Sequence, residues 1–339
     1  MKRSIIATVL GATLAVAATA ASAATTLETI KQRGELVCGS NTGLAGFGSP
    51  NDKGEWSGLD VDFCRAIAAA VLGDATKIKF VPLSAKDRFT ALQSSEIDVL
   101  VRNSTWTMSR DTSLGLNFTG VNYYDGQGFL VRKSLKVASA LELSGASICT
   151  QQGTTTELNL ADFFRANKLP YNVVTFATSD ETRQAYDAGR CDAFTTDASG
   201  LYAERLKLTA PDDHMVLPEI ISKEPLGPVV RHGDDQWFDI VKWVHYAMLT
   251  AEELGVTQAN ADEMLKNENP DIRRLLGVEG DFGKQLGLEN DWALKIIKAV
   301  GNYGESFDKN VGAGSPLKIE RGLNALWSKK GLQYAPPIR

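Results

Sequence analysis

The chain has 339 residues, of which 43% are hydrophobic and 23% charged, a composition typical of a soluble globular protein with about two domains. Its formal net charge is −5 and becomes −7 without residues 1–23, because that segment carries two cations, Lys2 and Arg3, and no acids. A mildly acidic chain does not attract nucleic acids or anionic membranes, so we expect no nucleic-acid partner.

The first 23 residues have the pattern of a secretory signal peptide. Lys2 and Arg3 precede an apolar run over 5–18, and Ala21-Ser22-Ala23 provides the small residues of a cleavage site. The apolar run is short for a membrane span. Ala24 follows the expected cut and no cysteine lies nearby to carry a lipid, so we expect the mature chain to be free in solution.

The next part of the chain alternates strand and helix patterns. Apolar runs predict strands over 35–40, 77–82 and 97–101. Helical patterns over 58–71 and after Ser84 lie between them. This β-α-β-α-β order predicts a parallel sheet covered by helices.

The same alternation is repeated further along. Strands and helices are expected in turn over 146–149, 157–166, 172–176, 180–188 and 191–195. A short strand over 127–131 precedes this repeat, and residues 225–231 have the pattern of an extended segment that bridges back. We therefore predict an α/β fold with two similar lobes that face each other.

Beyond residue 231 the patterns are helical. They cover 236–254, 259–266, 271–276, 292–300 and a last stretch over 319–327. Without an α/β core of their own, these helices are expected to wrap the first lobe. The predicted boundaries are a signal peptide over 1–23, a discontinuous first lobe over 24–131 and 226–339, and a second lobe over 132–225.

The four cysteines are Cys38, Cys64, Cys149 and Cys191. An even number after a secretory signal indicates two disulfides, with three possible connectivities. Proximity in the sequence favours Cys38–Cys64 and Cys149–Cys191. Free buried thiols are the alternative, and the spacing fits no zinc site. We expect no metal and no cofactor.

A dense row of polar donors, Asn103 to Asp111, follows the expected strand over 97–101. In α/β sheets, ligands bind beyond the carboxyl ends of strands. Donors without matching acids favour an anion, and the planar fork of Arg110 can hold a carboxylate through two parallel bonds. The alternative is an ordinary polar turn with a solvated arginine.

Two features of the second half could complete such a site. Gln151 to Thr155 precede the helix over 157–166, so backbone N–H groups and the hydroxyls of Thr154 and Thr155 could bind an anion, or cap the helix. Asp197 follows the strand over 191–195 and could accept bonds from an ammonium group, or cap the next helix.

Two residues of the first half are ambiguous. Phe47 could stack on or cover a ligand, although a loop aromatic is more often a core contact. Arg102 could neutralise an acidic ligand side chain, although we favour a surface position on the opposite face of the strand. We expect no catalytic residue, because the three histidines are sparse and no nucleophile elbow or nucleotide loop occurs.

Several motifs together resemble a known family. They are Trp56 to Cys64, Ile97-Asp98-Val99, Thr107 to Arg110, Gly153-Thr154-Thr155, and Cys191 to Phe194 followed by Asp197. In this order they are similar to the polar amino-acid-binding receptors of bacterial ABC transporters, family 3 of the solute-binding proteins. The segments 103–111, 301–305, 321–327 and 334–337 resemble its general L-amino-acid-binding branch.

This resemblance implies a type II periplasmic binding protein fold, with two lobes joined by two hinge strands and a C-terminal helical extension on the first lobe. It implies that Arg110 holds the ligand α-carboxylate and Asp197 the α-ammonium. Asn103 and Thr105 would bind from the first lobe, Thr154 and Thr155 from the second. Asn41 and Phe47 would lie in the first loop.

The implied function is a monomeric periplasmic receptor that binds L-amino acids with broad specificity, or a small γ-glutamyl peptide. It would deliver them to an ABC permease in the inner membrane. Many relatives have an acid near Asn41 and an aromatic near Leu44, and their absence here favours a permissive pocket. A dehydratase-like periplasmic enzyme and a ligand-sensing module are the alternatives.

Overall fold

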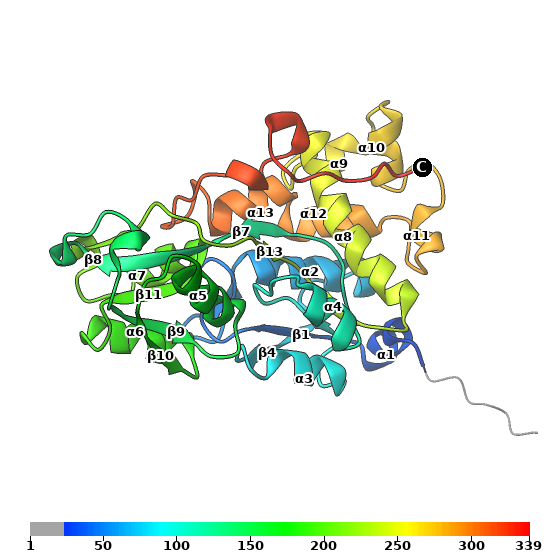
Figure 1. Cartoon of the computed structure of the whole chain (residues 1–339). Helices are drawn as coiled ribbons and strands as arrows, with labels where there is room; N and C mark the ends of the chain where they lie inside the picture. The colour runs from blue at the N-terminus through cyan, green and yellow to red at the C-terminus, as the bar shows by residue number, and fades with distance from the viewer. Residues whose placement is uncertain (1–23) are drawn as a thin grey trace, which may run out of the picture.

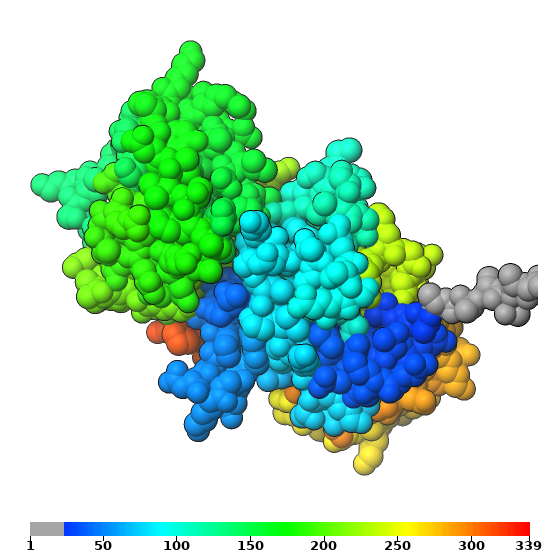
Figure 2. Space-filling view, turned by 90° about the horizontal axis from the view of Figure 1, so that it is seen from below, coloured from blue at the N-terminus to red at the C-terminus, as the bar shows by residue number. Residues whose placement is uncertain are grey.

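Two α/β lobes lie side by side in the structure, which is a computed structural model that describes residues 24–339 (Figure 1). The second lobe, green in Figure 2, meets the blue and cyan part of the first lobe along one face. The expected signal peptide over 1–23 lies outside the described residues. Within 24–339, no helix is both long and apolar enough to cross a membrane.

The first lobe is built on a five-stranded sheet in the order β4-β1-β5-β14-β6. Its strands are β1 (Leu36–Asn41), β4 (Ile78–Leu83), β5 (Val99–Leu100), β6 (Leu116–Phe118) and β14 (Val229–Arg231). β1 runs parallel to both β4 and β5, as the βαβ pattern predicts, and β14 runs antiparallel to β5. Because β14 follows the second lobe in the chain, the first lobe is assembled from two separate segments.

Short helices and one hairpin complete the N-terminal part of this lobe. They are α1 (Thr26–Arg33), α2 (Leu59–Leu72), α3 (Arg88–Gln93), α4 (Met108–Ser113), and the hairpin of β2 (Ser49–Pro50) with β3 (Trp56–Ser57). Nearly every residue of α2 is buried, because the helix is covered by the sheet and by the C-terminal helices.

The second lobe has a sheet in the order β10-β9-β11-β8-β12. Its strands are β8 (Gln127–Arg132), β9 (Ser147–Gln151), β10 (Asn172–Phe176), β11 (Ala193–Asp197) and β12 (His214–Val216), and its helices are α5 (Thr155–Ala166), α6 (Ser179–Asp187) and α7 (Ala198–Arg205). The boundary expected at residue 131 is wrong by one strand. β8 pairs with β11 and β12 along its whole length, so it belongs to the second lobe.

Both disulfides favoured by sequence proximity are formed. Cys38–Cys64 joins β1 to α2 in the first lobe, and Cys149–Cys191 joins β9 to the segment just before β11 in the second. No free cysteine remains in the described part of the chain. Each bridge therefore fixes a helix or strand against the central sheet of its own lobe.

The chain crosses between the lobes along two short strands, β7 (Tyr123–Asp125) and β13 (Glu224–Leu226). These strands pair with each other in antiparallel register and, among residues 24–339, with no other strand. β7 leads directly into β8 of the second lobe, and β13 leads back towards β14 of the first. This pair is the hinge expected for the fold.

A helical extension covers the first lobe, as predicted. It consists of α8 (Asp235–Glu253), α9 (Ala261–Met264), α10 (Pro270–Leu275), α11 (Phe282–Gln285), α12 (Trp292–Val300) and α13 (Tyr303–Asn310). The helix expected over 319–327 does not form. Gly322 has a φ of +47°, outside the right-handed helical region, and only the short 3-10 turns η4 (Gly322–Asn324) and η5 (Trp327–Lys329) occur.

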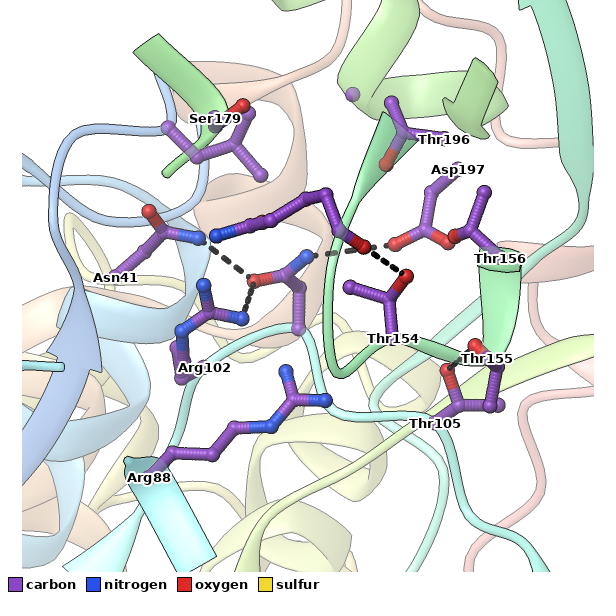
Figure 3. A pocket seen from close by; sticks show the side chains of 14 residues that line it. Asn41, Arg88, Arg102, Thr105, Thr154, Thr155, Thr156, Ser179, Thr196 and Asp197 are labelled. Atoms are coloured by element: carbon purple, nitrogen blue, oxygen red, sulfur yellow. Dashed lines mark hydrogen bonds between the residues drawn. The ribbon is translucent and has the colours of Figure 1, made fainter. Parts of the chain in front are cut away.

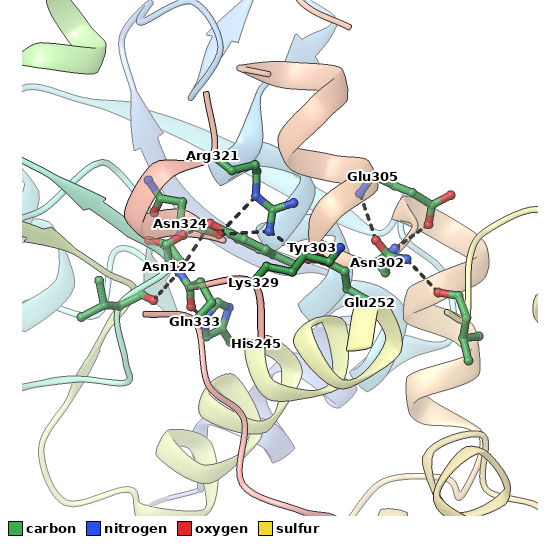
Figure 4. Close-up of polar contacts among 12 residues, drawn as sticks. Asn122, His245, Glu252, Asn302, Tyr303, Glu305, Arg321, Asn324, Lys329 and Gln333 are labelled. Atoms are coloured by element: carbon green, nitrogen blue, oxygen red, sulfur yellow. Dashed lines mark hydrogen bonds and ion pairs between the residues drawn. The ribbon is translucent and has the colours of Figure 1, made fainter. Parts of the chain in front are cut away.

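The extension also holds the chain that enters the hinge (Figure 4). The side chain of Asn324 accepts from the Tyr124 N–H at 2.7 Å and donates to the Tyr124 carbonyl at 3.0 Å. The Tyr303 hydroxyl donates to the Asn122 carbonyl at 2.8 Å. These bonds satisfy backbone groups of Tyr124 in β7 and of Asn122 just before it.

Asp60, in the first turn of α2, fixes the loop that follows β5. Its carboxylate accepts a bond from the Asn103 N–H at 2.8 Å and another from the Asn122 amide at 3.4 Å. Burial raises the pKa of Asp60 to about 6, although both hydrogen bonds and the nearby Arg102 act in the opposite direction. The loop carrying Asn103 is therefore anchored to a buried acid.

We expect the stability of an Asp60→Asn variant, relative to the parent protein, to rise with pH. The pKa of Asp60 is about 6 when folded and about 3.8 when unfolded. The stabilising effect of its proton is thus complete below pH 3.8 and is lost as the pH rises through 6. The relative gain between pH 4 and pH 7 should be about 2–3 kcal/mol, measured by urea unfolding at several pH values. A flat difference would contradict the buried, protonated carboxyl.

We expect replacement of Cys149 and Cys191 together by serine to destabilise the protein by about 3–4 kcal/mol, because the bridge constrains the unfolded chain. The two cysteines are 42 residues apart, against 26 for Cys38 and Cys64. The matched Cys38/Cys64 double variant should therefore lose slightly less. Urea midpoints of both variants test this, and an unchanged midpoint would contradict it.

Candidate functional site

A polar cavity lies between the lobes next to the hinge (Figure 3). Its first-lobe wall comes from the ends of β1 and β5 and the start of α3, and its second-lobe wall from β11 and the start of α5. The volume of the cavity is about 30 Å³, which is enough for a water molecule but too small for an amino acid. A larger ligand can therefore enter only when the lobes separate. Six residues predicted from the sequence line it: Asn41, Asn103, Thr105, Thr154, Thr155 and Asp197.

Asn103 joins the two walls. It has a positive φ of +27°, which asparagine adopts more readily than most residues. Its side-chain oxygen accepts from the Asn41 amide at 2.9 Å, and its amide nitrogen donates to the Asp197 carboxylate, across the cleft, at 3.3 Å. Asn103 is therefore a polar contact between a first-lobe loop and the second lobe.

Glu224, in hinge strand β13, accepts hydrogen bonds from hydroxyl groups of both lobes. Its carboxylate accepts from Thr105 Oγ1 at 2.5 Å and from Thr155 Oγ1 at 2.9 Å. Asn159 and Ser222 donate to its other oxygen. This role of Glu224 was not predicted, because a lone acid beside a proline in an extended segment gives no signal of it.

Asp197 ends β11 and faces the cavity. It occupies the N-cap position of α7, but its side chain makes no capping bond, so the alternative capping role is not the one the carboxylate performs. Burial and the neighbouring carboxylates of Asp125 and Glu224 raise the pKa of Asp197 well above its ordinary value. A cation placed beside it would favour the ionised form.

The first turn of α5 forms part of the second-lobe wall. Thr154 caps the helix, because its hydroxyl accepts from the Glu157 N–H and donates to the Gln151 carbonyl at 2.7 Å. Thr155 and Thr156 follow and also line the cavity. The positive end of a 12-residue helix therefore points at this space.

Two arginines of the first lobe line the cavity, and the expected surface position of Arg102 is wrong. Arg102 is 3% exposed and its Nε donates to the Leu83 carbonyl at 3.0 Å. The residues before it in β5 are buried on both faces, so alternation along the strand could not indicate its direction. Arg88, also 3% exposed, lies beside it and was not predicted (Figure 3).

Arg88 did carry a signal in the sequence. It is the first residue of α3, where a cation is unfavourable because it faces the positive end of the helix dipole. This opposition to the helix dipole costs only about 0.3–1 kcal/mol, so it is a weak signal of a role in the cavity.

Arg110 lies in α4, on the same lobe but set back from the cavity. Its Nη1 donates to the Thr105 carbonyl at 2.9 Å, and its guanidinium lies 5.1 Å from the centre of the Phe89 ring. Burial lowers its pKa, while Glu224 and Asp197 act in the opposite direction. The structure thus places Arg110 behind Thr105, outside the set of residues that line the cavity.

Phe47 does not reach the cavity, which corrects the expected ligand contact. It is 1% exposed, and its ring packs edge-on against Tyr123 with 5.1 Å between ring centres. The tight turn closed by the Leu44–Gly48 bridge directs the ring into the first-lobe core. Leu44, from the same turn, lines the cavity instead.

The described residues contain no group of three or more His, Cys, Asp or Glu side chains suited to a metal ion. His214 and His245 are buried away from the cavity, and burial lowers the pKa of His245 to about 4. The site offers guanidinium, carboxylate, amide and hydroxyl groups around one space. This chemistry suits a small ligand with both positive and negative groups.

Comparison with known proteins agrees with this description. AapJ, the general L-amino acid-binding periplasmic protein of Rhizobium johnstonii, is 62% identical over 341 positions, which cover 100% of both chains. BztA of Rhodobacter capsulatus, a glutamate/glutamine/aspartate/asparagine-binding protein, is 58% identical over 96% of this chain and 97% of its own.

A solved structure is also similar. It is an ABC transporter periplasmic binding protein from Brucella ovis with glutathione bound, 64% identical, with a TM-score of 0.92 over 94% of this chain and 100% of its own. The model of the bacterial extracellular solute-binding proteins, family 3, matches residues 36–262. The expected two-lobe fold is thus confirmed, and the chain belongs to family 3 of the bacterial extracellular solute-binding proteins.

Proposed function

We propose that this protein is the periplasmic substrate-binding component of an amino-acid ABC transporter. It binds L-amino acids between the lobes and delivers them to the inner-membrane permease. The observation that carries this proposal is the cavity beside the hinge, where a carboxylate from one lobe faces guanidinium groups from the other. A zwitterionic amino acid presents the complementary pair of charges.

Asp197 is the proposed partner of the ligand ammonium. Among residues 24–339 its buried carboxylate has a single side-chain donor, Asn103, which leaves acceptor capacity for a ligand. An ammonium group would supply up to three donors and offset the repulsion from Asp125 and Glu224. The full-length resemblance to a general L-amino acid-binding protein supports this role.

Arg110 is the proposed partner of the α-carboxylate. Its Nη1 is tied to the Thr105 carbonyl, which leaves the rest of the fork for a second acceptor. Asn41, Asn103 and Thr105 from the first lobe, with Thr154 and Thr155 from the second, would complete the shell around the ligand.

Hinge closure is the proposed mechanism of capture. Bonds already cross between the lobes, such as Lys207 Nζ to the Gly43 carbonyl at 2.6 Å and Asn103 to Asp197 at 3.3 Å. A ligand that contacts both walls binds the closed form more tightly than the open form, and this difference shifts the population towards closure. The closed receptor would then dock on the permease.

Export through the N-terminal signal, a monomeric mature chain and an inner-membrane permease as partner belong to the same proposal. A dehydratase-like enzyme is the alternative from another class and would need an acid/base pair at the cavity. Incubation with candidate substrates and a search for turnover separates the two. A sensory module would need a tether to a signalling domain.

We expect Arg110→Ala to weaken binding of L-glutamine roughly 10- to 100-fold, because the α-carboxylate loses a charged hydrogen-bond partner. Isothermal titration calorimetry on purified mature protein, freed of endogenous ligand by unfolding and refolding, measures this change.

Arg65→Ala is the matched control. Arg65 also belongs to the first lobe and lies over an aromatic ring, that of Phe80, but its guanidinium donates to the Trp56 carbonyl and not to a residue of the cavity wall, as Arg110 does at Thr105. Its variant should keep the parental affinity. Undiminished binding by Arg110→Ala would rule out the proposed role of Arg110.

A further inference from the structure

The N-terminus of α7 is capped by a residue of the hinge. Asp197 occupies the N-cap position, where a side-chain oxygen normally accepts the N–H of the second or third helical residue, but it makes no such bond. The second helical residue is Ser199, and its N–H donates instead to Asp125 Oδ1, in hinge strand β7, at 3.4 Å. Asp125 thus makes the bond that Asp197 would make in an ordinary helix.

Further bonds hold the start of α7 against the hinge. The Ser199 hydroxyl donates to Asp125 Oδ2, and the Ala198 N–H donates to the Gly126 carbonyl at 2.7 Å. Asp125 Oδ1 also accepts from the Gly126 N–H at 2.8 Å, which fixes the direction of its carboxylate. The first two N–H groups of α7 are therefore satisfied by residues 125 and 126 and not by the Asp197 side chain.

This arrangement leaves the Asp197 carboxylate at the cavity. It lines the space between the lobes, where it accepts from the Asn103 amide at 3.3 Å (Figure 3). If the same carboxylate also capped α7, it would have one oxygen fewer for a ligand ammonium. Capping by Asp125 removes this competition between the helix and the ligand.

Asp125 also adds negative charge close to Asp197. It lies directly opposite Glu224 in the β7–β13 pair, so the two side chains share one face of the hinge. Burial and the charge of Glu224 raise the pKa of Asp125 to about 6, although the bonds from Ser199 and Gly126 act in the opposite direction. Asp125 therefore acts on Asp197 both through the helix and through its charge.

We propose that Asp125 is a positioning residue for the ligand ammonium, because by capping α7 it keeps the Asp197 carboxylate available in the cavity. This inference rests on the proposed amino-acid-binding function and goes beyond it, since Asp125 lies outside the set of residues that line the cavity. The residue that positions Asp197 belongs to β7, so the ammonium site depends on the hinge as well as on the second lobe.

The test compares L-glutamine with glutaramate, which is glutamine without its α-ammonium group. Competition calorimetry of the mature protein and its Asp125→Ala variant measures both affinities. We expect glutamine to bind roughly 5- to 10-fold more weakly to the variant, because Asp197 then caps α7 for part of the time. The affinity for glutaramate should change by no more than about twofold, because this ligand offers Asp197 no ammonium donor.

Asp125→Asn is the conservative variant. Both backbone N–H groups bond to Oδ1 of Asp125, and the Ser199 hydroxyl at Oδ2 can accept from an amide instead of donating. An asparagine can thus reproduce all three bonds. We expect its glutamine-to-glutaramate affinity ratio to stay within about threefold of the parental ratio. A loss as large as that of Asp125→Ala would overturn capping as the role of Asp125.

The pH dependence of binding is a readout that helix stability alone would not move. The titratable and charged groups that act on Asp197 are Asp125 and Tyr123 of β7, Glu224 of β13, and Arg88, Arg102 and Arg110 of the first lobe. Burial, Asp125 and Glu224 raise the pKa of Asp197. Glutamine affinity should therefore fall as the pH decreases through this pKa, because a protonated Asp197 does not pair with an ammonium.

This fall in affinity should move to lower pH in Asp125→Asn, because the variant lacks one of the charges that raise the pKa of Asp197. Calorimetry between about pH 4.5 and pH 8 measures the profile. An identical profile in the parent and the variant would show that Asp125 does not act on Asp197 and would overturn the proposal. If Asp125→Ala does not fold, this comparison decides alone.

Asp234→Ala is the matched control for loss of an acidic cap. Asp234 caps α8 in the helical extension, where it accepts from the Trp237 N–H at 3.0 Å and the Thr26 N–H at 2.8 Å. Circular dichroism and thermal melting establish that each variant is folded. We expect both alanine variants to melt at lower temperature than the parent, and only Asp125→Ala to lose its preference for glutamine over glutaramate.

Equal affinity ratios in the parent, Asp125→Ala and Asp234→Ala would make Asp125 a structural cap only and would overturn the proposal. A parent protein that binds glutamine and glutaramate equally would refute the ammonium role of Asp197, and this proposal with it. Failure of the parent to bind any common L-amino acid is a different result and would refute the proposed function itself.

Discussion

The pairing of β7 with β13 determines how the two lobes can move relative to each other. In the described part of the chain, these strands form the only two-stranded link between the sheets of the lobes, so any motion of one lobe relative to the other bends this pair. Glu224 lies within it, fully buried, and binds Thr105 of the first lobe and Thr155 of the second. The hinge therefore contributes directly to the polar contacts of the cavity.

The cavity contains buried charges of opposite sign, and each sign is supplied by a different lobe. Charges removed from water need close partners. Here the acid Asp197 and the arginines Arg88 and Arg102 are supplied by different walls, and no ion pair closer than 4.0 Å joins them in residues 24–339. A ligand that is itself dipolar satisfies both walls at once, which couples recognition to closure.

The sequence predicted the parts of this arrangement that depend on local pattern and order. Apolar runs located the strands of both sheets, and polar residues at strand ends located Asn103, Thr105 and Asp197. The sequence did not predict the positions of side chains that could point to either face of their strand or turn. Arg102 follows residues buried on both faces, and Phe47 turns inward because of a tight turn, so periodicity could not place either. The role of Glu224 and the non-helical conformation near Asn324 could not be predicted, because both depend on contacts between residues far apart in the sequence.

The discontinuous first lobe also sets an order in which a chain that emerges from its N-terminus can become structured. The second lobe is complete once β12 has emerged, with its own sheet and its Cys149–Cys191 bridge. The sheet of the first lobe lacks β14 until residue 231, and β7 lacks its contact with Asn324 for almost a hundred residues more. Both bridges join cysteines that are consecutive in the sequence. A chain oxidised in order from its N-terminus would therefore form the native pairs without reshuffling.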